Sequence, residues 1–140
     1  MIEENVDFLE EYKHLDNLLK DSLQTSEGVS EYIRIMESER LDYKNKDFYQ
    51  KIKHLRWIRN QLAHNPETMR QDMCDQDDID DIKSIYNSIM KMEDPKSLQH
   101  KKEKHINQQK NKIEVNETNH TWLFIGLLIV LIIIVIYSIF

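Results

Sequence analysis

The sequence predicts an all-α fold: a bundle of four short helices, then a flexible linker and a single C-terminal transmembrane helix. Three observations predict it. Between residues 1 and 94 only one Gly and one Pro interrupt the chain, and no alternating strand pattern appears. Apolar residues recur there at steps of three and four. Residues 122–140 are uncharged and almost wholly apolar. The expected units are therefore a bundle at 1–95, a linker at 96–121 and a membrane span at 122–140.

The first two helices follow from the spacing of their apolar residues. The first covers 5–23, and its stripe is Phe8, Tyr12, Leu15 and Leu19. The segment TSEG then breaks the pattern, and Gly28 is free to adopt positive φ because it has no Cβ. The second, shorter helix begins at Val29 and reaches Met36, and residues 38–47 lose periodicity and are expected to form a loop.

The third and fourth helices have recognisable ends. Asp47 is the expected N-cap of the third helix, which should end before Pro66 because the residue preceding proline disfavours the α conformation. Its apolar stripe is Phe48, Ile52, Leu55, Ile58 and Leu62. Asp75 and Asp78 resemble a capping box at the start of the fourth helix, which should close at the sequence EDP. Its stripe is Ile79, Ile82, Tyr86 and Ile89.

The C-terminal third of the chain divides into two segments. Residues 96–121 are rich in Lys, His, Asn and Gln without a persistent apolar face, which favours a flexible linker that continues partly as helix. The 19 residues from Trp122 to Phe140 would be about 28 Å long as a helix, close to the thickness of a bilayer core. The sequence thus predicts an anchor in the lipid bilayer through 122–140.

The flanks of this span predict its orientation. Lysines precede it and none follows, so we expect a single-pass membrane protein with a cytoplasmic N-terminal domain and its C-terminus on the outer side. The acidic N-terminus lacks the apolar core of a signal peptide. Cys74, the lone cysteine, fits a reducing compartment and should be chemically inert.

Charge is distributed unevenly within the predicted bundle. Residues 1–95 hold 13 Lys and Arg against 22 Asp and Glu, which excludes nucleic-acid binding by general attraction. No Asp or Glu occurs between residues 48 and 66, however, and this segment carries Lys51, Lys53, His54, Arg56, Arg59 and His64. The third helix is therefore the cationic element, and Lys51, Lys53 and Arg56 are its expected RNA-binding residues.

The end of this helix, LRWIRNQLAHNP, places Arg59, Asn60 and His64 close together. Arginine presents a fork of donors that fits phosphate oxygens, and histidine titrates near neutrality and can move protons. Asparagine can orient a neighbour or a ligand. These groups would suffice for metal-independent RNA cleavage, with His64 as acid–base, Arg59 as phosphate clamp and Asn60 as orienting residue. Alternatively, they complement the helix dipole and have a structural role.

The segment RNQLAH resembles the signature of the HEPN superfamily (higher eukaryotes and prokaryotes nucleotide-binding domains). That signature is an Arg, a polar residue and then a His, matched here by Arg59, Asn60 and His64 with four intervening residues. The resemblance covers roughly residues 5–94. It implies a four- to five-helix up-and-down bundle that pairs as a homodimer, with Arg and His of both protomers facing one cleft.

Many members with this signature are ribonucleases of toxin–antitoxin, phage-defence and RNA-processing systems. The resemblance therefore implies RNA as a partner and a cognate antitoxin or regulatory protein. The net acidity and the membrane anchor depart from a free ribonuclease and favour a tethered effector.

Other features give no further chemistry. The run DQDDIDD lacks the turn glycine and final Glu of a calcium loop, and the histidines show no paired metal spacing, so we expect neither metal nor cofactor. Trp57 and Tyr49 are interpreted as core or dimer contacts. The alternative function is a non-catalytic membrane-anchored adaptor that binds a protein partner. A tail-anchored coiled coil is disfavoured, because the apolar runs are short and interrupted.

Overall fold

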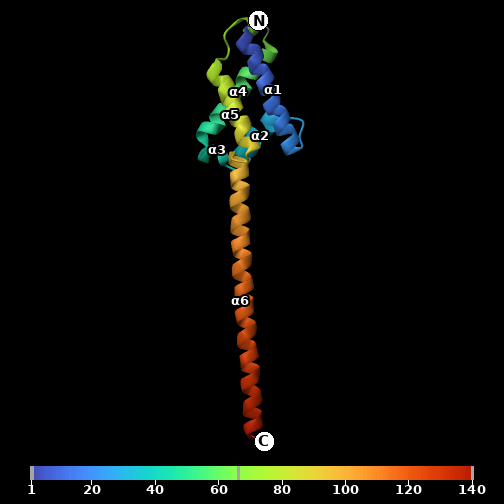
Figure 1. Ribbon diagram of the computed structural model, residues 1–140, viewed down its shortest axis with the longest axis vertical. Helices are drawn as coiled ribbons and strands as arrows, with labels where there is room; N and C mark the ends of the chain where they lie inside the picture. The colour runs from blue at the N-terminus through green and yellow to red at the C-terminus, as the bar shows by residue number, and fades with distance from the viewer. Residues whose placement is uncertain (1, 66, 140) are drawn as a thin grey trace. The chain divides into compact units, whose positions relative to one another are not determined.

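A computed structural model describes residues 2–65 and 67–139, with side chains up to residue 109 and at 122 and 124–136. Every regular element within these residues is helical, which confirms the all-α prediction (Figure 1). The elements are α1 (Glu3–Leu23), α2 (Gly28–Ser38), α3 (Leu41–Lys44), α4 (Lys46–His64), the 3-10 turn η1 (Thr68–Arg70), α5 (Gln76–Met90) and α6 (Pro95–Ile139). The chain divides into two compact units, Met1–Gln99 and His100–Phe140.

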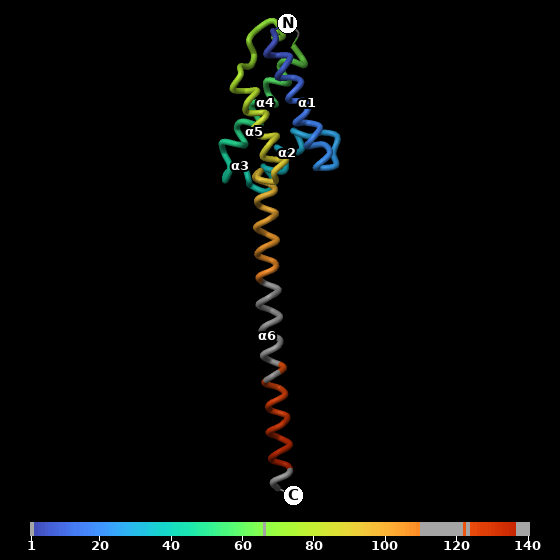
Figure 2. The backbone as a smooth tube through the Cα atoms, in the orientation of Figure 1, coloured from blue at the N-terminus to red at the C-terminus, as the bar shows by residue number. Residues whose placement is uncertain are grey.

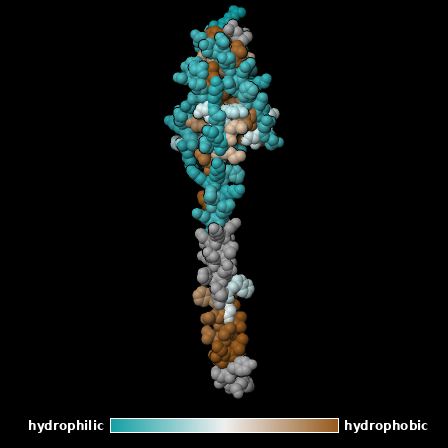
Figure 3. Space-filling model, in the orientation of Figure 1, coloured by the Kyte–Doolittle hydropathy of each residue, from teal (hydrophilic) through white to brown (hydrophobic). Residues whose placement is uncertain are grey.

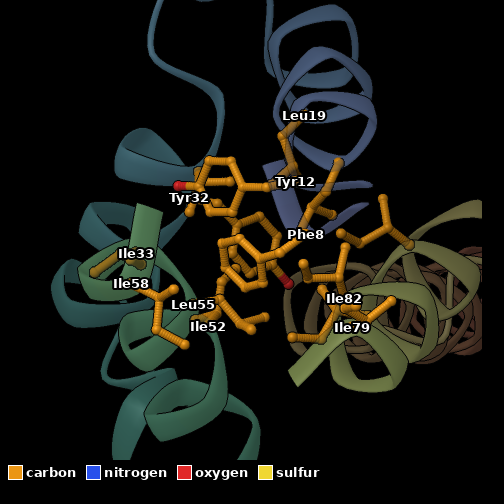
Figure 4. Packing of buried hydrophobic residues seen from close by; sticks show 14 of the residues in the cluster. Phe8, Tyr12, Leu19, Tyr32, Ile33, Ile52, Leu55, Ile58, Ile79 and Ile82 are labelled. Carbon is orange, nitrogen blue, oxygen red and sulfur yellow. The ribbon is translucent and has the colours of Figure 1, made fainter. Parts of the chain in front are cut away.

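The first unit is held by one apolar core to which α1, α2, α4 and α5 all contribute. Figure 4 shows Phe8 of α1, Tyr32 of α2, Leu55 of α4 and Ile82 of α5 converging. Each of these side chains is almost completely buried. The predicted stripes of the first, third and fourth helices face this core, with two exceptions: Phe48 of α4 and Tyr86 of α5 are only partly buried. Ile85 is the buried residue at that part of α5. Burial of these faces is the main source of the bundle's stability.

Two predicted helix boundaries are correct and two are not. The Asp75–Asp78 capping box is present in both directions, at 3.0 and 3.2 Å. Helix α4 ends at His64, as predicted. Asp47 is not an N-cap, because α4 begins one residue earlier, at Lys46. The expected loop at 38–47 contains the short helix α3, which forms because Leu41 is drawn into the core.

Gly28 does not use its freedom to adopt positive φ. Its role is a close approach between helices, since a Cβ at this position would lie 2.1 Å from the carbonyl oxygen of Asp16 on α1. The Asp16 side chain accepts a 2.9 Å hydrogen bond from the backbone N–H of Val29. A carboxylate of α1 thus caps the first turn of α2, where no local side chain does so.

The connection after α4 returns to the start of α1 and is fixed there by buried polar groups (Figure 2). Asn5 of α1 is fully buried, and its amide donates to the carbonyl of Gln71 at 2.8 Å. Thr68 donates to the carbonyl oxygens of Gln61 and Asn65 at the end of α4. The carbonyl oxygens of Gln61 and Asn65 also accept the backbone N–H groups of Asn65 and Thr68, so the connection is joined to the end of α4 by several bonds.

Helix α6 begins at a buried N-cap. Asp94 is only 2% exposed, and its Oδ2 accepts from the backbone N–H of Ser97 at 3.2 Å, while Pro95 occupies the first helical position. Residues 96–121, expected as a flexible linker, form part of α6, in agreement with the alternative that helix continues toward the span. Lys, Gln and Glu are good helix formers, which accounts for the difference.

The apolar stretch of the second unit forms a continuous brown surface near the C-terminal end in Figure 3. Its described side chains, at 122 and 124–136, are exposed. Side chains 123 and 137–140 of the predicted span lie outside the described residues. Among the residues that are described, no helix combines enough length and apolar character to cross a membrane.

Candidate RNA-binding site on α4

The polar residues of α4 divide into two faces around its buried stripe. On the face toward α5, the Lys51 ammonium lies 2.8 Å from Asp81, and His54 Nε2 lies 3.2 Å from Asp78. The hydrogen bond to Asp81 raises the pKa of Lys51. These two groups are therefore engaged by the acidic start of α5, and Lys51 lies apart from the other predicted RNA-binding residues.

The opposite face of α4 lines an open groove of about 600 Å³ with α2. Its α4 side consists of Lys53, Arg56, Trp57 and Asn60, which share one face at helical spacing. Its α2 side consists of Ser30, Ile33, Arg34 and Glu37, with Glu27 just before the helix. Two predicted RNA-binding residues and one predicted catalytic residue thus meet in one concave surface.

The predicted catalytic residues are adjacent at the end of α4, but they do not form one hydrogen-bonded group. Arg59 Nη1 donates to Asn60 Oδ1 at 3.1 Å, and of these two residues only Asn60 lines the groove. His64 is exposed at the last position of α4, where its side chain bonds to no other described residue. Both Arg59 and His64 are open to solvent and are not buried in mutual hydrogen bonds.

Trp57 was interpreted from the sequence as a core or dimer contact, and the core part of that interpretation is wrong. Its side chain is 51% exposed and lines the groove. Its ring lies nearly parallel to that of His54, with the centroids 6.0 Å apart. The sequence contained an indication that Trp57 is exposed, because Trp57 falls outside the apolar stripe from Ile52 to Leu62.

Arg34 was not identified from the sequence as a site residue. It lies on α2, far from the motif along the chain, and no local pattern marks it. Only the packing of α2 against α4 brings it to the groove.

Cys74 behaves as expected from its environment. It is buried beside Asn5, and burial together with nearby carboxylates, among them Asp78 and Asp75, raises the pKa of its thiol to about 11. The thiolate that would be needed for nucleophilic chemistry is therefore disfavoured. Within the described residues, no group of three or more His, Cys, Asp or Glu side chains is arranged to hold a metal ion.

Comparison with known proteins assigns a family. A family model described as a family of unknown function (DUF6548) matches residues 6–122. The chain belongs to the DUF6548 family. The match includes all of α4 and the groove residues of α2, together with the polar part of α6. No curated protein and no solved structure matches the chain.

Proposed function

We propose that this DUF6548 protein is a membrane-tethered, HEPN-like endoribonuclease that acts as a homodimer without a metal ion. The observation that carries the proposal is the open, cationic end of α4, where Arg59, Asn60 and His64 are solvent-accessible in an otherwise acidic bundle. The finer architecture, an up-and-down bundle with an anchor through 122–140, belongs to the same proposal.

In the proposed reaction, the 2′-hydroxyl of one nucleotide attacks the adjacent phosphorus while the bond to the 5′-oxygen breaks. His64 of one protomer takes the proton from the 2′-hydroxyl, and the partner subunit's His64 gives a proton to the departing 5′-oxygen. Arg59 stabilises the charge that develops on the phosphate oxygens. The products are a 2′,3′-cyclic phosphate and a 5′-hydroxyl, so the atoms and protons balance without a co-reactant.

Asn60 has a positioning role in this mechanism. Its amide oxygen accepts from Arg59, so the guanidinium is held with its remaining donors free for phosphate. The Thr68 hydroxyl has an indirect positioning role. Its bonds to the carbonyls of Gln61 and Asn65 hold the end of α4, which carries His64.

Variants of the full chain test the proposal. RNA cleavage is measured in detergent micelles with EDTA for the wild type, His64→Ala, Arg59→Ala and Arg59→Lys. We expect His64→Ala to lose roughly 10²–10⁴-fold in rate, the range for a general acid–base. Arg59→Lys should recover only part of the Arg59→Ala loss, because lysine lacks the bidentate fork.

The control is His14→Ala, which removes an exposed histidine of α1 and should leave the rate unchanged. The nuclease assignment fails if the wild type does not cleave RNA, or if His64→Ala and Arg59→Ala cleave it as fast as the wild type.

A further inference from the structure

The groove between α2 and α4 contains more than the motif requires. Besides Asn60, it is lined by three cations, a half-exposed indole and two carboxylates. Its volume of about 600 Å³ is in the range of small-ligand sites and would hold one or two nucleotides. The internal contacts of these groups decide which of them can reach a ligand.

Several of the groove's charges are already engaged. The Tyr49 hydroxyl donates to Glu37 at 2.5 Å, and the Lys53 ammonium lies 3.1 Å from the same hydroxyl. Arg34 is paired with Glu31 on its own helix. Arg56, by contrast, makes no hydrogen bond or ion pair with any other described residue. Arg56 is therefore the cation best placed to accept an anion.

The indole of Trp57 adds an apolar surface next to this cation. Arg56 and Trp57 are consecutive residues of α4, and both line the groove. The His54 ring lies nearly parallel to one face of the indole, with the ring centroids 6.0 Å apart. A flat aromatic beside a free guanidinium is the combination that binds unpaired nucleotides, in which a base stacks and the adjoining phosphate pairs.

We propose that this groove binds single-stranded RNA, with a base stacked on Trp57, a phosphate on Arg56 and the next nucleotide directed toward Asn60 and Arg59. The inference rests on the proposed function and deepens it, because it specifies unpaired RNA as the substrate. A duplex does not fit this scheme, since its bases are already stacked on one another. The competing occupant is a peptide, because Glu27 and Glu37 in the groove could pair with its cationic groups. The competition experiment below distinguishes a peptide from RNA.

Binding is tested with a short 2′-O-methyl oligoadenylate, which lacks the attacking hydroxyl and is not cleaved. The chain has two tryptophans, so in full-length Trp122→Phe protein the fluorescence comes from Trp57 alone. We expect saturable quenching as the oligonucleotide is added. In anisotropy titrations with a labelled oligonucleotide, Trp57→Ala should weaken binding roughly 5- to 150-fold, the range for loss of one stacked base.

Matched variants make the test specific. Trp57→Phe keeps a stacking surface and should retain most of the affinity, whereas Arg56→Ala should lose at least about fivefold. Lys46→Ala removes an exposed cation at the start of the same helix that does not line the groove, and it should bind like the wild type. Circular dichroism confirms that each variant is folded.

The inference is overturned if quenching does not saturate, if Trp57→Ala binds as tightly as the wild type, or if a duplex of the same sequence binds as tightly as the single strand. It is also overturned if an acidic or basic peptide displaces the oligonucleotide at lower concentration than unlabelled oligonucleotide does. Failure of the catalytic proposal can be distinguished from failure of this inference. If the protein binds the oligonucleotide but cleaves no RNA, only the catalytic proposal is contradicted.

Discussion

Asp94 and Tyr32 form a buried pair that ties the start of α6 to α2. The Tyr32 hydroxyl donates to Asp94 Oδ2 at 2.6 Å, and both side chains are almost fully buried. Burial, and next the hydrogen bond to Asp94, raise the pKa of Tyr32. Burial likewise raises the pKa of Tyr12, where nearby Asp16 adds to the shift. Folding therefore favours the protonated form of both tyrosines.

This preference makes the bundle sensitive to alkali. Tyrosine in an unfolded chain titrates near pH 10, and both folded-state pKa values are higher. Above about pH 10 the unfolded chain loses protons that the folded chain retains, so the free energy of unfolding falls as pH rises. Below about pH 9 the contribution is fully present. Urea unfolding followed by circular dichroism at pH 8 and at about pH 11 should show this decline.

Tyr32→Phe identifies the residue responsible. At pH 8 the variant should lose about 1.5–3 kcal/mol, the range for a hydrogen bond to a charged group, and its further decline at high pH should be smaller. Tyr43→Phe is the control, because Tyr43 is exposed and should not change the profile. An alkaline decline in Tyr32→Phe as steep as in the wild type would contradict the assignment.

At the scale of elements, helix positions were readable from the sequence because burial imposes a helical period on apolar residues. The Asp75–Asp78 cap was readable as well, since both partners are local. The α3 helix and the partners of Gly28 were not, because each depends on packing between distant segments. The motif at the end of α4 was found because its residues are close in sequence. The groove was not found, because one of its walls comes from α2, which is distant along the chain.

The contact between α1 and α2 gives a prediction at this scale. Gly28→Ala places a methyl group 2.1 Å from the Asp16 carbonyl, so the helices must separate or α2 must begin later. We expect a loss of about 1–3 kcal/mol in the free energy of unfolding, the usual cost of overpacking. Gly126→Ala is the matched control, because a Cβ there has no neighbour within 4 Å. Equal stability of the two variants in urea titration would contradict the close-approach explanation.

In the whole molecule, the acidic charge lies in the bundle and the exposed apolar side chains lie near the end of α6. The acidic bundle offers an RNA phosphate little general attraction. The RNA binding that we propose therefore relies on the few cations near the groove, and we expect its dependence on salt to be shallow. The exposed apolar side chains at 122 and 124–136 favour lipid as their surroundings. We therefore propose that the active site works near a membrane surface.

Membrane anchorage is tested by fractionation of cells that express the full chain. We expect the protein in the membrane pellet and resistant to carbonate extraction. Replacing Ile129 and Ile133 with Lys should move it to the supernatant, since each charge costs about 2.5–3.5 kcal/mol at the centre of a span. Ile106→Lys makes the same exchange in the polar part of α6 and should leave the protein in the pellet. Wild-type protein in the supernatant would rule out the anchor.

We propose that the end of α4 carries out chemistry at an RNA phosphate. The most direct measurement is mass spectrometry of the ends produced when the full-length protein is incubated with RNA and EDTA. We expect 2′,3′-cyclic phosphate and 5′-hydroxyl ends that disappear with His64→Ala and persist with His14→Ala. Intact RNA, or 5′-phosphate ends that are unchanged by His64→Ala, would contradict it.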